Sequence, residues 1–182
     1  MPSYSFKKEA QVHIVNGTTS RYQIDVSEIS FSQTFAQHNY STKTLHSPSN
    51  VFEGSVINKA NKANFEFEFP AIVEEGYKTA FFNHLLNVTS FDLYVKTEAD
   101  IFKLETAVIT NGTFVIEKSR PLSITIQGEA SKLTRDATLP NITEVYSSTK
   151  TYVKPAIAIT LNTVAQANIA EVSMELQNEV QW

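Results

Sequence analysis

Histidines and two closely spaced glutamates are the residues of this sequence best suited to catalysis or metal binding. The histidines are His13, His38, His46 and His84. No two of them stand four positions apart, the spacing that presents two imidazoles to one zinc ion from a helix. Glu66 and Glu68 would lie on one face of a strand, about 7 Å apart, but solvated strand faces carry charges routinely. We therefore interpret these histidines and glutamates as packing or surface residues.

Other catalytic patterns are missing from the sequence. There is no cysteine, and no serine stands in a Gly-x-Ser-x-Gly turn that would expose it as a nucleophile. The 5 glycines are scattered, so they do not form a phosphate-binding loop. The sequence predicts a protein that is not an enzyme and that uses no metal or cofactor.

Composition narrows the class of protein further. The chain has 182 residues, which favours a single domain over 1–182, and 19 acidic against 15 basic residues give a net charge of −4. A groove that grips nucleic acid normally has a basic excess, which this chain lacks. No apolar run approaches the roughly 18 residues of a membrane-spanning helix, so we expect no membrane insertion by this chain.

Alternating apolar and polar residues predict that most of the chain forms strands. In the segment 64–70, phenylalanines alternate with glutamates, so one face of the strand is expected to be buried and the other solvated. Pro70 should end this strand, because proline cannot donate a ladder hydrogen bond. Similar alternation predicts strands near 91–95, 102–106, 122–126, 157–161 and 172–176.

Two Asn-Gly pairs predict β-hairpins. Asn16-Gly17 and Asn111-Gly112 each stand between alternating segments. Asparagine and glycine tolerate the positive φ angles of a type I′ turn, so each pair is expected to form the turn of a hairpin.

One segment predicts a helix. From about Val73 to Leu86 the apolar residues recur at helical spacing, acidic residues stand in the first turn, and Asn87 follows as a stop. The predicted fold is therefore mainly β, an antiparallel β-sandwich or barrel with one flanking α-helix over about 73–86.

Two polar segments do not suit a compact core. The segment 31–62 is rich in serine, threonine, asparagine and glutamine, with β character on both sides of a turn at 47–50, and is predicted to be a long projecting hairpin arm. The segment 131–154 is predicted to be a polar loop. Such segments are expected to become ordered against a partner. The candidate inter-subunit residues of the arm are Phe35, Tyr40, Leu45, His46, Val51 and Phe52.

Many strands in a small domain leave rows of unpaired backbone groups at sheet edges. Proteins blunt such edges or pair them with another chain, so strands combined with a polar arm predict an assembly module. The terminal Trp182 either packs on a neighbouring subunit, packs on its own chain or extends into solvent.

The segments 43–46, 52–61 and 63–70, together with 124–133, resemble tail tube proteins of tailed bacteriophages. The order of early hairpin, long arm, single helix and later strands is also similar to that family. The resemblance implies a structural subunit of the virion tail, synthesised in the host cytoplasm. It further implies hexameric rings that stack into a tube, with contacts to other tail proteins at the tube ends.

The resemblance also implies a continuous barrel of strands around a channel that conducts DNA during ejection. Such channels are typically acidic, so that DNA passes transiently without specific binding. The candidate channel-lining residues are Glu66, Glu68, Asp92, Glu98, Asp100 and Glu105. The alternative for each is a salt-bridged position on the outer surface, and Lys96 and Lys103 lie close to the last four in the sequence.

Other functions remain open. Another β-sandwich virion component, such as a tail terminator, baseplate hub or head-decoration protein, would form a closed oligomer that does not polymerise alone. A monomeric carbohydrate-binding module would need a cluster of exposed aromatic residues, for which Tyr94 and Tyr146 are the isolated candidates.

Overall fold

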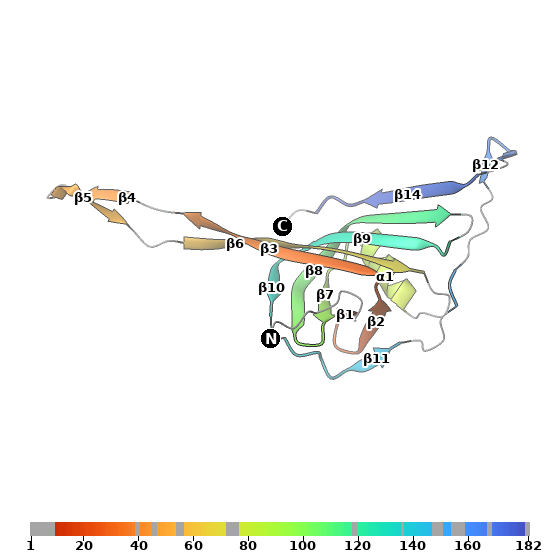
Figure 1. The fold of residues 1–182 in the computed structure, drawn as a ribbon, viewed down its shortest axis with the longest axis horizontal. Coiled ribbons are helices and arrows are strands. Elements are labelled where there is room, and N and C mark those ends of the chain that lie inside the picture. The colour runs from red at the N-terminus through yellow and green to blue at the C-terminus, as the bar shows by residue number, and fades with distance from the viewer. Residues whose placement is uncertain are drawn as a thin grey trace.

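A computed structural model describes residues 10–180 apart from 39–40, 45–46, 54–56, 72–76, 118–119, 136, 147–150, 154–158 and 167–168. The structure is mainly β with one helix among these residues, which confirms the predicted class (Figure 1). Trp182 lies outside the described residues.

The principal strands form one 10-stranded sheet that is bent into two layers. We call the first layer the body sheet, in the order β11-β2-β1-β7-β8-β10. Its strands are β1 (Gln11–Asn16), β2 (Ser20–Asp25), β7 (Phe91–Lys96), β10 (Lys132–Thr134), β11 (Thr143–Val145) and the first half of β8 (Ile101–Glu117). The pairing of β11 with β2 is parallel, whereas the other pairs described here are antiparallel.

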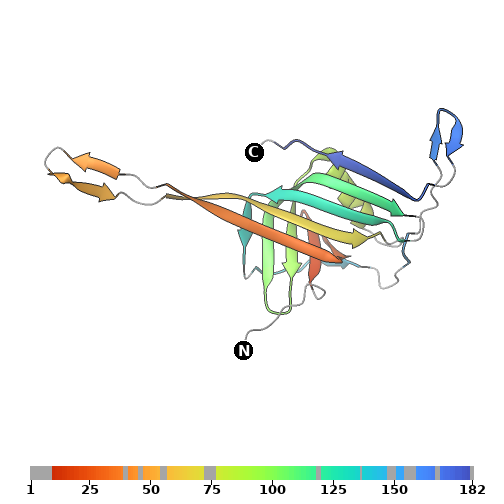
Figure 2. The ribbon, with the colours of Figure 1, turned by 45° about the horizontal axis from the view of Figure 1, so that its top comes forward.

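We call the second layer the arm sheet, in the order β14-β8-β9-β6-β3. Its strands are β3 (Glu28–His38), β6 (Ile57–Pro70), β9 (Ser123–Ala130), β14 (Glu171–Gln177) and the second half of β8. Every neighbouring pair in this layer is antiparallel. Both layers are visible in Figure 2, where the strands of the body sheet cross behind those of the arm sheet.

Strand β8 belongs to both layers. Its residues up to Ala107 pair with β7, and those from Val108 onward pair with β9. Just before this change of partner, Thr106 adopts a left-handed φ of 52°, and its amide donates a 3.1 Å hydrogen bond to Asp92 Oδ1. A strand that changes sheets needs such an irregularity to turn the corner.

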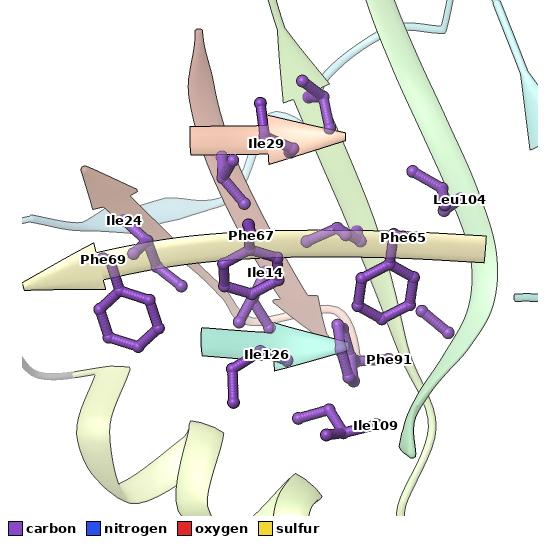
Figure 3. Close-up of a cluster of buried hydrophobic side chains, with 14 of the residues drawn as sticks. Ile14, Ile24, Ile29, Phe65, Phe67, Phe69, Phe91, Leu104, Ile109 and Ile126 are labelled. Atoms are coloured by element: carbon purple, nitrogen blue, oxygen red, sulfur yellow. The ribbon is translucent and has the colours of Figure 1, made fainter. Parts of the chain in front are cut away.

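The core lies between the two layers (Figure 3). Phe65, Phe67 and Phe69 of β6 point into it and are almost fully buried, as the alternation in 64–70 predicted. They face Ile14 and Leu93 of the body sheet in one continuous apolar cluster. Strand β6 ends at Pro70, also as expected.

Helix α1 (Tyr77–Asn87) contacts β8 and β2. The predicted helix is confirmed from Tyr77 onward, including its end at Asn87, while 73–76 lie outside the described residues. A Cβ atom at Gly112 would lie 3.1 Å from a methyl carbon of Leu85, so glycine permits the close approach of α1 to β8.

The hairpin prediction at Asn111-Gly112 is wrong. Both residues lie inside the continuous strand β8, next to a register shift against β9. The glycine is required there for helix packing and not for a turn.

The hairpin at Asn16-Gly17 is confirmed as β1-β2, but its turn is not the expected two-residue type. Asn16 pairs with Ser20, so the loop spans 17–19, with Gly17 at a φ of 69°. A two-residue turn with positive φ at both positions occurs instead at Asn162-Thr163, between β12 (Ile159–Leu161) and β13 (Val164–Gln166).

The predicted arm projects from the body as an extended pair of β3 and β6 (Figure 2). Beyond it, β4 (Ser41–Thr44) pairs with β5 (Ser47–Glu53). The arm starts later than expected, because Phe31 packs against Phe102 with ring centroids 5.1 Å apart. Projection begins at the register shift between Gln33 and Phe35, where β6 has also passed the end of its pairing with β9.

Polar side chains fasten the base of the arm. Gln33 donates a 2.7 Å hydrogen bond to the carbonyl of Asn61 and accepts one from the amide of Leu133 in β10. Asn61 in turn donates to the hydroxyl of Thr34 at 2.9 Å. These bonds connect both strands of the arm to the body.

The expected polar loop 131–154 does not project. Its short strands β10 and β11 pair with β8 and β2, and Arg21 donates a hydrogen bond to the carbonyl of Pro140. The described parts of the loop therefore lie against the body sheet, and its two short strands extend that sheet at β8 and at β2.

Candidate assembly surface

The outer face of the arm sheet is polar because each of its strands alternates between core and solvent. Register aligns one row of side chains across all of its strands. The row consists of Glu28, Glu68, Thr125, Thr113 and Glu175. Side chains so aligned form one continuous surface.

This surface, which we call the acidic face, carries mostly carboxylates. Its acidic residues are Glu28, Glu66, Glu68, Glu117, Glu129, Glu171 and Glu175. The cations described on it are Lys62, whose Nζ lies 2.9 Å from Glu129 Oε2, and Arg120, whose Nε lies 3.3 Å from Glu117 Oε2. The surface therefore has a strong negative excess.

Glu66 and Glu68, two of the predicted channel-lining residues, lie on the acidic face, on β6 between β9 and β3. Glu66 is exposed, and Glu68 accepts a 2.7 Å hydrogen bond from the hydroxyl of Ser123. Hollows of about 360 Å³ and 230 Å³ lie beside them, lined mainly by polar side chains such as Ser30, Gln127 and Thr125. The surface is suited to contact with water and not to enclosure of an apolar ligand.

The other predicted channel-lining residues lie on the body sheet. Lys103 Nζ is 3.0 Å from Asp92 Oδ2 and 3.7 Å from Glu105 Oε1. Asp100 forms a 3.0 Å ion pair with Arg135 in the turn between β7 and β8, which also carries Glu98. Because the two layers pack with their inner faces together, their outer faces point in opposite directions. One channel could follow only one of these two groups of carboxylates.

A buried histidine lies beneath the polar loop on the body sheet. His13 is only 2% exposed, and its Nδ1 is 3.5 Å from Glu144 Oε1. Burial lowers the pKa of His13 to about 4, against the smaller raising effect of Glu144, while Arg21 and Lys96 lower it further.

We expect the protein to lose stability as the pH falls from 7 to 4. The unfolded His13, with a pKa near 6.5, binds a proton in this range that the folded protein does not bind, so the folded state loses roughly 2 to 3 kcal/mol. Urea unfolding at pH 7 and at pH 4 measures the difference. His13→Gln should reduce the pH dependence to the part contributed by other groups, such as His84, whose pKa burial also lowers. An unchanged dependence would contradict this assignment.

The predicted arm residues are only partly described. Phe35 is 66% exposed at the base of the arm, in keeping with a contact residue. Val51 and Phe52 lie on β5, for which the structure describes the backbone. Tyr40, Leu45 and His46 lie outside the described residues.

Sequence reasoning missed the contribution of the outer strands to the acidic face. Glu28 and Glu175 lie on it because β3 and β14 flank the sheet. Alternation within each segment was visible in the sequence, but the order of strands that brings these residues together was not.

The described part of the chain shows neither a metal site nor a membrane-spanning helix. No group of three or more histidine, aspartate or glutamate residues is arranged to hold a metal ion there. None of the helices described is both long and apolar enough to cross a membrane. Tyr94 is buried and Tyr146 is 43% exposed, so these two do not form the aromatic platform of a carbohydrate-binding module.

Chains of several solved injection-system and virus-like particles share this fold. The chain is similar to a chain of the sheath–tube complex of an extracellular contractile injection system, with a TM-score of 0.52 and 11% identity, covering 74% of this chain and 93% of the other. It is also similar to a chain of the anti-feeding prophage tube-terminating cap, with a TM-score of 0.50 and 12% identity, covering 76% and 94%.

A third similar chain comes from the virion of a native gene transfer agent, with a TM-score of 0.50 and 8% identity, covering 74% of this chain and 100% of the other. At such low identity these likenesses establish the fold alone. No curated protein sequence matches the chain.

The sequence itself identifies the family. Residues 73–182, more than half of the chain, match the model of the bacteriophage baseplate tube protein family. The chain belongs to this family, and it is a structural protein of the virion tail and not an enzyme.

Proposed function

We propose that the chain is a ring-forming subunit of a phage-type tail tube, folded as a single domain over 1–182. Hexameric rings stack into a tube, and the acidic face lines its channel. The observation that carries this proposal is the acidic face itself, a polar surface that crosses every strand of the arm sheet. Chains of the same fold in a sheath–tube complex and in a tube-terminating cap support it.

An acidic channel suits the passage of DNA. The phosphate backbone is strongly negative, and binding to it requires cations that release its counterions. The cations described on the acidic face, Lys62 and Arg120, are each engaged by a carboxylate. DNA would therefore be repelled by the walls and would slide without being held.

The arm supplies contacts to other subunits. Its two strands extend away from the core, and the exposed Phe35 lies where projection begins. A hairpin with so little support from its own chain gains most by packing on a neighbour. We assign the contacts with adjacent subunits and the next ring to this arm and to its residues Phe35, Tyr40, Leu45, His46, Val51 and Phe52.

A second candidate position is the baseplate end of the tube, which the name of the family favours. Negative-stain microscopy of the purified full chain distinguishes the two. A subunit of the tube shaft forms open-ended tubes with an axial channel, whereas a baseplate ring or a terminator forms closed rings that do not grow. A chain that remains monomeric at high concentration would contradict both.

Reversing one charge on the acidic face should make the assembled particle retain DNA. Glu66→Lys changes the charge of every subunit by two units at an exposed position in the proposed channel. We expect assembled Glu66→Lys protein to co-sediment with short duplex DNA, with retention that falls as salt rises, whereas the unaltered protein retains none.

The matched control is Glu98→Lys, which makes the same charge change at an exposed position in the turn between β7 and β8, away from the acidic face. It should not retain DNA. Equal retention by both variants would show that the acidic face does not line the channel.

A further inference from the structure

We propose that residues 131–145 protect an edge of the body sheet from strand addition by a second copy of this chain. We call this segment the strap, and the structure describes all of it except residue 136. Its strand β10 pairs with β8 and its strand β11 pairs with β2, so the strap reaches both ends of the body sheet. Figure 1 shows these two short strands on opposite sides of that sheet. The inference concerns the fold of one subunit and does not depend on the proposed ring.

Strand β2 would form an open edge of the body sheet without β11. It pairs with β1 on one side and with β11 on the other. An open edge presents unpaired N–H and C=O groups, which favour the addition of another strand. Because each copy of this chain is mainly strands, a strand of a second copy could extend such an edge. Strand β11 occupies the positions from Ser20 to Tyr22 that the added strand would need.

Strand β11 is itself a poor template for further pairing. It consists of three residues, Thr143–Val145, and the chain bends just before it, where the amide of Ile142 donates a 3.0 Å hydrogen bond to the carbonyl of Pro140. Very short edge strands and nearby prolines are means by which natural sheets limit edge-to-edge association. The sheet therefore ends at β11 with a shorter edge than the six residues of β2 would offer.

Arg21 of β2 fastens β11 in place. One of its terminal nitrogens donates a 2.8 Å hydrogen bond to the carbonyl of Pro140, and the other donates a 2.8 Å hydrogen bond to Glu144 Oε2. The bond from Arg21 lowers the pKa of Glu144, as expected when the charged form of a carboxyl group is stabilised. A parallel pairing of three residues has few backbone hydrogen bonds of its own. The bonds from Arg21 therefore hold two points of the strap against the edge.

The other end of the strap is anchored separately at β8. The amide of Ser131 donates a 2.9 Å hydrogen bond to the carbonyl of Glu105, and the amide of Ala137 donates one of 2.9 Å to the carbonyl of Ile101. Strand β10 also donates to the side chain of Gln33 at the base of the arm. Release of β11 should therefore open the edge of β2 while β10 stays attached to the body.

Arg21→Ala in the full-length chain tests the protection by releasing β11. Hydrogen exchange followed by mass spectrometry should show exchange roughly tenfold faster in β2, which corresponds to about 1.4 kcal/mol, and unchanged exchange in β10. The purified variant should form irregular aggregates that bind thioflavin T under conditions in which the unaltered chain does not. The matched control is Arg120→Ala, which removes an arginine paired with Glu117 outside the strap and should change neither measurement.

A reversible disulfide separates loss of protection from a general loss of stability. The chain has no cysteine, so Ser20→Cys with Thr143→Cys places a single pair of thiols at partner positions of β2 and β11. Neighbouring strands lie about 4.8 Å apart, within the range of Cα separations that a disulfide bridges. When this pair is added to Arg21→Ala, oxidation should prevent the irregular aggregates and reduction should restore them.

Three outcomes would overturn the proposal. Faster exchange in β2 without irregular aggregates would show that the open edge attracts no second strand. Unchanged exchange in Arg21→Ala would show that β11 does not depend on the bonds that we assign to its attachment. Aggregation that persists with the disulfide closed would place the aggregating surface elsewhere in the chain. The proposed tube is tested separately, by negative-stain images of the unaltered chain.

Discussion

Replacing Gly128 by alanine is expected to prevent the protein from folding stably. A Cβ atom at this position would lie 2.2 Å from Cζ of Phe65 and 2.4 Å from the backbone oxygen of Val108. Both distances are far below van der Waals contact, and the backbone oxygen belongs to the paired strand β8, so it cannot move without breaking the sheet. We expect a loss of at least about 3 kcal/mol in the free energy of unfolding, measured by urea denaturation.

The same substitution at Gly17 provides the control. Gly17 has a left-handed φ of 69°, but no atom lies within 4 Å of a Cβ added there. Gly17→Ala should therefore cost only the backbone preference, about 1 kcal/mol. Similar losses for the two variants would show that crowding at Gly128 is not what requires glycine.

Replacing Phe67 by alanine should reduce stability by a similar amount, but by removing buried atoms instead of adding one where there is no space. Phe67 is fully buried at the centre of β6, and its ring stacks against Phe65 and Phe69 at centroid distances of 6.1 Å and 5.9 Å. Truncation leaves a cavity between the two layers, for which about 3 to 5 kcal/mol is expected. Thermal denaturation of the purified variants measures this loss.

Phe35→Ala makes the same chemical change on the same sheet at a residue that is 66% exposed. Its stability should change by less than about 0.5 kcal/mol. If the arm contacts neighbouring subunits, this variant should remain folded and assemble less well, with fewer or shorter particles by negative stain. Normal assembly would remove Phe35 from the proposed contact.

The periodic pattern of apolar residues predicted the strand β6 and the helix α1, because the conformation of each is determined mainly by its own residues. Alternation at Phe65, Phe67 and Phe69 identified β6 and its buried face, and helical spacing identified α1 through Asn87. In both cases the side chains repeat with the period of the element, so the signal lies within a few residues.

Features that depend on distant residues could not be predicted in this way. Asn111-Gly112 has the composition of a turn, yet it lies in β8 because Leu85 of α1 needs the space above Gly112. The reverse holds at Asn162-Thr163, where a tight turn forms although threonine disfavours positive φ. In neither case does the local sequence determine whether the chain turns.

The acidic face, too, could be predicted only in part. The sequence identified Glu66 and Glu68 as solvated carboxylates, because that property depends on alternation alone. It could not separate them from Asp92 and Glu105, since only the pairing of the strands places these two residues on the other layer. The edge strand β14 became part of the surface through its pairing with β8, which joins segments far apart in the sequence.

The continuity of β6 from the arm into the core has a mechanical consequence. A pull on the arm along its length loads β6 lengthwise against both β3 and β9, so many backbone hydrogen bonds resist at once in shear. Had the arm been inserted between two strands through a loop, the same pull would peel the bonds apart one at a time. Tension between neighbouring subunits would thus be transmitted directly into the strand that carries Phe65, Phe67 and Phe69 into the core.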